Sequence, residues 1–268
     1  MRQLLISLCF LLGLTHSVAA QDTPLISLET SADGRGWDSV GRLDIHGKGF
    51  CTAALIDVHL ILTAAHCVYD DAGNIIDADQ FTFSAGLRNG RAEATRGIQS
   101  TTAHPDYVHN GSVARTSSVA VDIAVLRLDQ PIRRARVQPY PIADRPTIGD
   151  QIGVVSYGRG RAEVPSLQQV CSVMDQQTGV VIMNCDVDFG SSGSPVFMVK
   201  DGKTSIVSVV SAMSEWNGEK VSLGTSLGAP LRALLAHYNG AGPAKPGGTQ
   251  RLVTNGERNE TGAKFIRP

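Results

Sequence analysis

The chain has 268 residues, of which 24 are Lys or Arg and 25 are Asp or Glu, so its formal net charge at pH 7 is −1. The basic residues are scattered along the sequence, which argues against binding to nucleic acid or to an anionic membrane surface. Composition therefore indicates a soluble globular protein, with room between residues 21 and 240 for one large β domain or two small ones.

Residues 1–20 have the layout of a secretory signal peptide. Arg2 is the only charged residue, an apolar run from Leu4 to Leu14 follows, and Val18-Ala19-Ala20 supplies small residues for cleavage. The run is too short to span a bilayer, and a buried N-terminal helix would show a polar stripe that is missing here. We therefore predict a secreted or periplasmic protein.

Of the five cysteines, Cys9 lies in the signal segment and four remain. An even number of cysteines in an exported chain predicts two disulfides, for which three pairings are possible. A zinc site is the alternative, but the sequence has no Cys-x-x-Cys pair and no histidines clustered near the cysteines. We predict no metal and no cofactor. The four cysteines are Cys51, Cys67, Cys171 and Cys185.

From about residue 25 to residue 230, short β-branched or alternating runs are separated by turn residues. Asn89-Gly90 and Asn217-Gly218 are typical of tight hairpin turns. Short strands with frequent turns and no long helical periods predict an all-β fold, either barrels or a sandwich. The clearest runs cover residues 53–62, 122–128, 151–157, 179–185 and 204–212.

One helix is predicted near the end of the chain. Residues 229–238 carry apolar residues at helical spacing, with Pro230 in the first turn and Gly240 as a stop signal. Residues 241–268 are rich in Gly and Pro at first and then polar without periodicity, which predicts a linker and flexible tail.

Three short segments carry residues that are unremarkable alone but complementary together. His66 follows an apolar run, Asp122 opens an apolar strand, and Ser192 lies in the Gly/Ser segment 190–194. A serine hydroxyl needs an imidazole to take its proton, and the imidazole needs a carboxylate to orient and stabilise it. A Gly-x-Ser-Gly turn also aims backbone N–H groups at the oxyanion formed during acyl transfer.

The residues that carry this chemistry resemble those of the trypsin/chymotrypsin family of serine peptidases, over roughly residues 37–238. Thr63-Ala64-Ala65-His66-Cys67 is similar to the family's histidine motif, Asp122-Ile123-Ala124-Val125-Leu126 to its aspartate motif, and Gly190-Ser191-Ser192-Gly193-Ser194-Pro195 to its serine motif. The order His, Asp, Ser is also that of the family. The resemblance implies two six-stranded antiparallel β-barrels packed together, the first at about 25–135 and the second at about 136–228. A C-terminal helix would follow at about 229–239.

The resemblance also implies roles for individual residues. Ser192 would be the nucleophile, His66 the general base and acid, and Asp122 the orienting carboxylate. The N–H groups of Gly190 and Ser192 would form the oxyanion hole. Ser211 would support Asp122 and line the specificity pocket. A Cys51–Cys67 disulfide is implied by the histidine motif, which leaves Cys171 and Cys185 to pair.

Ser191 departs from the pattern of animal digestive relatives, which carry Asp there to bind a newly cut N-terminus. The chain also lacks an Ile-Val-Gly-Gly-like start near Trp37. We therefore expect an enzyme that is active without N-terminal insertion. The serine motif is most similar to that of bacterial, glutamyl-endopeptidase-like members.

The pocket residues allow several interpretations. Asp186 lies six residues before Ser192, where trypsin-like members carry the carboxylate that binds Arg or Lys. Asp188 could supply this carboxylate instead, or both aspartates could be surface charges. Met213 is expected to narrow the pocket. Glutamate-specific relatives use a histidine after the nucleophile, and only His237 follows Ser192 here.

The sequence thus predicts a secreted serine endopeptidase that forms an acyl-enzyme and prefers Arg or Lys at the cleavage site. Its partners would be protein or peptide substrates, and we expect a monomer that neither binds nucleic acid nor spans a membrane. The alternative is a catalytically inactive homologue that serves as a secreted binding module. An esterase of the Gly-x-Ser-x-Gly type is disfavoured, because its histidine follows its serine.

Overall fold

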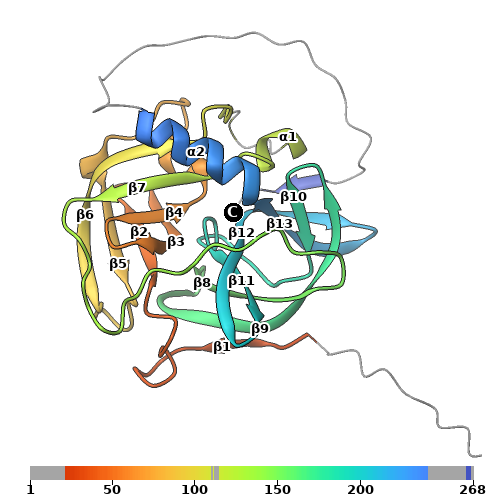
Figure 1. The fold of residues 1–268 in the computed structure, drawn as a ribbon, viewed down its shortest axis with the longest axis horizontal. Helices are drawn as coiled ribbons and strands as arrows, with labels where there is room; N and C mark the ends of the chain where they lie inside the picture. The colour runs from red at the N-terminus through yellow and green to blue at the C-terminus, as the bar shows by residue number, and fades with distance from the viewer. Residues whose placement is uncertain (1–21, 110, 112–114, 241–263, 267–268) are drawn as a thin grey trace, which may run out of the picture.

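The computed structural model describes residues 22–109, 111, 115–240 and 264–266. Two β-barrels lie side by side, and helix α2 (Gly228–Gly240) packs across their junction (Figure 1). This confirms the predicted all-β fold with a C-terminal helix. Among the residues that the structure describes, no helix combines the length and the apolarity needed to cross a membrane.

The first barrel is closed, antiparallel and six-stranded, in the order β2-β3-β4-β7-β6-β5. Its interior is filled by side chains that are 0% exposed, including those of Leu43, Leu55 and Phe83. Short 3₁₀ turns η1 (Ala65–Val68) and η2 (Ala78–Gln80) lie between β4 and β5. The strands are β2 (Val40–Ile45), β3 (Gly49–Asp57), β4 (Leu60–Thr63), β5 (Phe81–Ala85), β6 (Ala94–Ala103) and β7 (Ala124–Leu128).

The second barrel follows the path β9-β10-β13-β12-β11-β8, and the pairing of β8 with β9 closes the ring. Two short strands add to its edges: β1 (Leu25–Ser27) pairs with β9, and β14 (Lys264–Ile266) pairs with β12. The barrel strands are β8 (Gln151–Gly158), β9 (Arg161–Gln177), β10 (Val180–Met183), β11 (Pro195–Lys200), β12 (Lys203–Trp216) and β13 (Glu219–Ser226).

Most of the predicted runs correspond to strands, with one difference. The run 53–62 is a hairpin of β3 and β4 rather than one strand, because the chain turns at Val58 and His59. The Asn217-Gly218 turn joins β12 and β13, and both residues have positive φ (52° and 83°). The predicted signal peptide lies outside the described residues. Of the predicted tail, only the residues of β14 are described.

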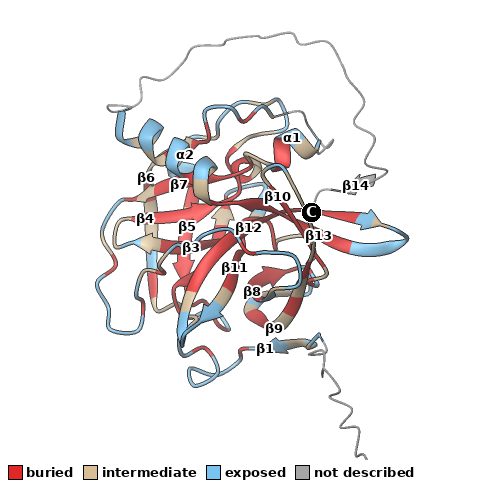
Figure 2. Ribbon diagram, turned by 45° about the vertical axis from the view of Figure 1, so that its right-hand side comes forward, coloured by how far each residue is buried: buried red, intermediate tan, exposed pale blue. Residues whose placement is uncertain are grey.

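A shared apolar cluster joins the two barrels. It contains Val125 from the first barrel, Phe197 from the second, and Leu231 and Leu234 from α2. The ring of Tyr140 packs edge-on to that of Phe197, with 4.7 Å between their centroids. Buried positions follow the strands of both barrels (Figure 2). The junction is therefore an apolar core in its own right, and it holds the two barrels in a fixed relative position.

The short helix α1 (Thr116–Val119) lies just before β7.

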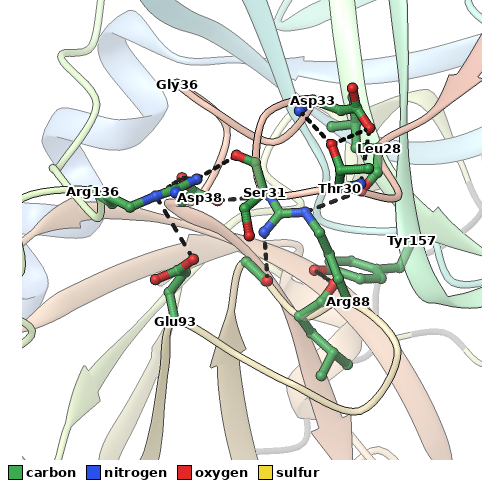
Figure 3. Close-up of polar contacts among 12 residues, drawn as sticks. Leu28, Thr30, Ser31, Asp33, Gly36, Asp38, Arg88, Glu93, Arg136 and Tyr157 are labelled. Carbon is green, nitrogen blue, oxygen red and sulfur yellow. Dashed lines mark hydrogen bonds and ion pairs between the residues drawn. The ribbon is translucent and has the colours of Figure 1, made fainter.

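A buried ion pair anchors the segment that leads into the first barrel (Figure 3). Arg88 Nη2 lies 2.7 Å from Asp38 Oδ1, and the two side chains are 8% and 1% exposed. Arg88 also donates to the carbonyl oxygens of Leu28 and Gly86. The other carboxylate oxygen of Asp38 binds Arg136, whose side chain is 39% exposed. One carboxylate thus binds one buried and one accessible guanidinium.

Arg88→Met should lower the free energy of unfolding by about 3–5 kcal/mol, because it removes the buried charge that compensates the buried Asp38 carboxylate and the donor to the Leu28 and Gly86 carbonyl oxygens. Urea unfolding of the purified variant measures this cost. Arg136→Met, which acts on the same carboxylate from the surface, is the matched control and should cost about 0–1 kcal/mol. Equal costs for the two variants would contradict the role given to burial.

Candidate active site

His66 and Asp122 are brought together by the register of two neighbouring strands. β4 ends at Thr63, and the η1 turn that follows it carries His66. Asp122 lies two residues before β7, which pairs with β4 so that Thr63 faces Ala124. Because the pairing is antiparallel, the residues just after β4 and just before β7 lie at the same end of the barrel.

The carboxylate of Asp122 is 1% exposed and accepts three hydrogen bonds. The His66 backbone N–H donates to Oδ1 at 2.8 Å, His66 Nδ1 lies 2.7 Å from Oδ2, and the Ser211 hydroxyl, on β12 of the second barrel, donates to Oδ2. Burial alone raises the pKa of Asp122, but the neighbouring His66 and these hydrogen bonds outweigh burial. Its pKa therefore lies below the ordinary 3.8, and the carboxylate is ionised at neutral pH.

Ser192 lies in the loop between β10 and β11, where two glycines satisfy steric requirements. Gly190 has φ +93°, and a Cβ there would lie 2.3 Å from the Phe50 ring. Gly193 has φ +80°, and a Cβ there would lie 2.0 Å from Thr63 Oγ1. Any other residue would clash in either position, so both positions must be glycine for the loop to pack against the first barrel.

Two side-chain atoms at this junction have no hydrogen-bond partner among the residues that the structure describes. Within the described part of the chain, neither Ser192 Oγ nor His66 Nε2 has a hydrogen-bond partner, and both are buried from solvent. The N–H groups of Gly190 and Ser192 likewise donate to no described residue. A buried polar group without a partner is costly, so such a concentration of unpaired groups is typical of a site that receives a ligand.

The carbonyl groups of the same loop are held by Thr52, on β3 of the first barrel. The Thr52 N–H donates to the Ser192 carbonyl at 2.8 Å, and Thr52 Oγ1 donates to the Gly190 carbonyl at 2.9 Å. Thr52 Oγ1 also accepts from the Tyr157 N–H at 3.1 Å. Thr52 belongs to none of the three motifs that carry His66, Asp122 and Ser192. Its only local signal is its place directly after Cys51.

A cleft of about 700 Å³ opens beside these groups. Both barrels contribute to it, with His66 and Ser192 in its wall. The β2–β3 turn supplies Lys48, the start of β3 supplies Phe50, and the second barrel supplies Arg159 and Phe189. The Arg159 guanidinium lies over the Phe189 ring, 4.0 Å from its centroid. Asp71 also lines the cleft and lies 3.1 Å from Lys48 Nζ, so the cleft offers apolar surface beside an ion pair and the Arg159 guanidinium.

The predicted pocket residues lie in three different surroundings. Ser211 is buried against Asp122, as described above. Met213 is 8% exposed and packs in the apolar cluster that fills the second barrel. Asp186 has a side chain that is 59% exposed, and its Oδ1 lies 3.3 Å from Lys220 Nζ. Asp188 caps the nearby Phe189 N–H through Oδ1 at 2.7 Å. The structure therefore does not gather Asp186 and Ser211 around one buried position.

The four cysteines form two disulfides. Cys51 bonds to Cys67, and Cys171 bonds to Cys185. This is the pairing that the family resemblance implies. The donor atoms of Cys51, His66 and Cys67 lie within 4.8 Å of one another, but the disulfide leaves no thiolate there to bind a metal.

Comparisons with known proteins agree with this geometry. A solved structure described as a Glu endopeptidase in complex with MPD superimposes with a TM-score of 0.62, at 21% sequence identity, over 76% of this chain and 92% of that one. That likeness concerns the fold. A search of curated proteins found no match. The family model described as Trypsin matches residues 29–225, which is most of the chain. The chain therefore belongs to the trypsin family of serine peptidases.

Proposed function

We propose that this protein is an active serine endopeptidase that hydrolyses peptide bonds through an acyl-enzyme intermediate. The observation that carries the proposal is that Ser192 Oγ and His66 Nε2, which have no hydrogen-bond partner among the described residues, belong to side chains in the wall of one cleft. Their supporting residue Asp122 is buried and binds the other nitrogen of the same imidazole. Family membership makes protein or peptide substrates the natural partners.

In this mechanism Ser192 Oγ attacks the carbonyl carbon of the scissile bond while its proton moves to His66 Nε2. The tetrahedral intermediate collapses, the C–N bond breaks, and the amine leaves with the proton from His66. Water then attacks the acyl-enzyme ester, giving its proton to His66. The acid product departs as Ser192 Oγ takes that proton back. Asp122 holds the imidazole tautomer and stabilises its charged form throughout.

The oxyanion of each tetrahedral intermediate needs fixed donors. The N–H groups of Gly190 and Ser192 suit this role because no described residue accepts from them. The carbonyl groups of both residues are fixed by Thr52, which limits rotation of the loop. Donors that are already in place stabilise the developing charge without reorganisation, and this is usually the largest electrostatic contribution to catalysis.

We further propose that the enzyme is exported and acts as a monomer, outside the reducing cytosol and without nucleic acid. The two disulfides support export, since such bonds persist in oxidising compartments. The predicted signal peptide lies outside the described residues. Activity without N-terminal insertion is part of the proposal: residues 25–27 run along the outer edge of β9, paired with residues 166–168.

A preference for Arg or Lys is the finer part of the proposal. Asp186 is the candidate carboxylate, but it is exposed and already bound to Lys220. A cationic substrate side chain would have to displace Lys220, and an exposed ion pair is worth only about 0–1 kcal/mol. We therefore expect a modest preference for basic residues.

A fluorophosphonate probe should label Ser192 of the folded mature protein, because the probe reacts with serines activated by a neighbouring imidazole. Mass spectrometry of the labelled peptide identifies the site. Ser192→Ala should abolish labelling and peptide cleavage, whereas Ser194→Ala should retain both. A folded wild-type protein that is not labelled would instead favour an inactive binding module.

Asp122→Asn should lower kcat about 10⁴-fold, since an amide stabilises the wrong imidazole tautomer. KM on the same peptide should change little, because Asp122 is buried and does not face the cleft. Steady-state kinetics measure both constants. Asp106→Asn, on an exposed side chain of the first barrel, is the control and should leave kcat unchanged.

Asp186→Asn should lower kcat/KM for substrates with Arg at the cleavage site, relative to Leu, by up to about fivefold, the equivalent of about 1 kcal/mol. A peptide library cleaved by wild type and variant gives both ratios. Asp188→Asn is the parallel arm. An unchanged ratio for Asp186→Asn with a lowered one for Asp188→Asn would move the assignment to Asp188.

A further inference from the structure

Arg161 reaches from the first position of β9 into the loop that carries Ser192. Its Nη2 donates to Ser191 Oγ at 3.1 Å, and its Nη1 donates to the Ser156 carbonyl on β8. Ser191 is the residue directly before the proposed nucleophile and is 0% exposed. A long charged side chain on a hairpin usually extends into solvent, whereas Arg161 is half-buried and its guanidinium binds groups of the protein.

The Ser191 hydroxyl is fully engaged. It accepts from Arg161 and from the Asp188 N–H at 3.2 Å, and it donates to the Tyr157 carbonyl at 3.1 Å. A hydroxyl has one donor and two acceptor positions, so all three are used. The Ser191 N–H in turn donates to the Asp188 carbonyl at 2.9 Å. The loop from Asp188 to Ser191 is thus tied to β8 and to Arg161 through one side chain.

The β8–β9 hairpin grips the same loop at a second point. The Arg159 N–H donates to the Phe189 carbonyl at 2.7 Å. That carbonyl belongs to the same peptide unit as the Gly190 N–H, and a trans peptide is planar, so the two bonds point in opposite directions. Because the Phe189 carbonyl points toward the hairpin, the Gly190 N–H points away from the hairpin.

The backbone of the hairpin leaves room for the Arg161 side chain. A Cβ at Gly158 would lie 2.8 Å from Arg161 Cζ and 2.9 Å from Nε, so the guanidinium rests directly against the Gly158 backbone. Burial lowers the pKa of Arg161, and the nearby carboxylates of Asp186 and Asp188 oppose that shift. The guanidinium keeps its charge at neutral pH, because an Arg pKa starts far above 7.

We propose that Arg161 is a positioning residue that holds the 188–192 loop in its oxyanion-binding conformation, in place of any cation supplied by a newly cut N-terminus. This rests on the proposed peptidase function and deepens it. Arg161 acts through Ser191 and through the hairpin that also binds Phe189; it does not touch the reacting atoms. The oxyanion site is therefore assembled by folding alone.

The test compares Arg161→Met, which keeps the aliphatic stem and removes all donors, with Arg161→Lys. Kinetics are measured on a peptide that the wild type cleaves, together with the affinity for a peptide boronate whose tetrahedral adduct occupies the oxyanion hole. Arg161→Met should lower kcat by about 10²–10³-fold, the range for loss of one oxyanion donor. KM should stay within about threefold, and boronate affinity should fall in parallel with kcat/KM. Arg161→Lys should recover part of the loss.

Arg232→Met, on the exposed face of α2, is the matched control and should match the wild type. A double-mutant cycle with Ser191→Ala tests the route of action: Arg161→Met should cost much less in the Ser191→Ala background, because the two residues share one interaction. Full additivity would overturn the proposed route. If Arg161→Met fails to fold, as judged by circular dichroism, the kcat, KM and boronate values of folded Arg161→Lys decide the question.

The proposal is overturned if folded Arg161 variants keep the wild-type kcat, or if they raise KM alone. It is also overturned if the wild type gains activity only after cleavage to a new N-terminus. Probe labelling of wild-type Ser192 reports separately on the peptidase function. A wild type that is labelled, with Arg161 variants that are equally active, refutes only the positioning role. A wild type that is neither labelled nor active refutes both.

Discussion

The carboxylate of Asp122 is the constraint on which the arrangement of the two barrels depends. It is almost fully buried, and a buried charge is strongly destabilising unless hydrogen bonds and opposite charge compensate it. His66 supplies two of its contacts from the first barrel, and Ser211 supplies the third from the second barrel. The apolar cluster around Phe197 contributes non-directional free energy to docking. The hydrogen bond from Ser211 adds the directional requirement, because full compensation exists only when β12 lies against the start of β7.

The loop around Ser192 meets a complementary requirement, since it must approach the first barrel closely and still keep N–H groups free. Glycine at positions 190 and 193 removes the Cβ atoms that would strike Phe50 and Thr63. Glycine has no side chain to make packing contacts, so the backbone of the loop needs other restraints. Thr52 holds its carbonyl groups from the first barrel, and the 158–161 hairpin holds it from the second. Backbone freedom at the glycines is thereby offset by hydrogen bonds from both sides.

The sequence predicted the parts of this design that are local. The strand runs, the 229–238 helix and the three short motifs each depend on residues close together in the chain, so periodicity and motif order were sufficient. The turn at Val58 and His59 was missed because neither residue is a typical turn former. Thr52 and Arg161 were missed for another reason: Thr52 contacts Gly190 across 138 positions and Arg161 contacts Ser191 across 30. A threonine in a strand and an arginine that follows a turn glycine carry no local sign of such contacts. The ion pair of Asp186 likewise involves Lys220, which lies 34 positions away in the sequence.

The two disulfides reinforce the same two sides of the loop. Cys51 precedes Thr52 and Cys67 follows His66, so one covalent bond joins the neighbour of the residue that binds the Ser192 carbonyl to the neighbour of His66. Cys171 lies on β9, the strand that begins with Arg161, and Cys185 begins the segment that leads to Ser192. Each bond closes a loop of about 15 residues, which restricts the unfolded chain by about 3 kcal/mol in the chain-entropy account. In the folded state each also limits how far its anchor moves relative to the loop. Because the proposed oxyanion donors would be useful only when fixed to a fraction of an ångström, the placement of these bonds beside Thr52, His66 and the 186–192 segment matters as much as their contribution to stability.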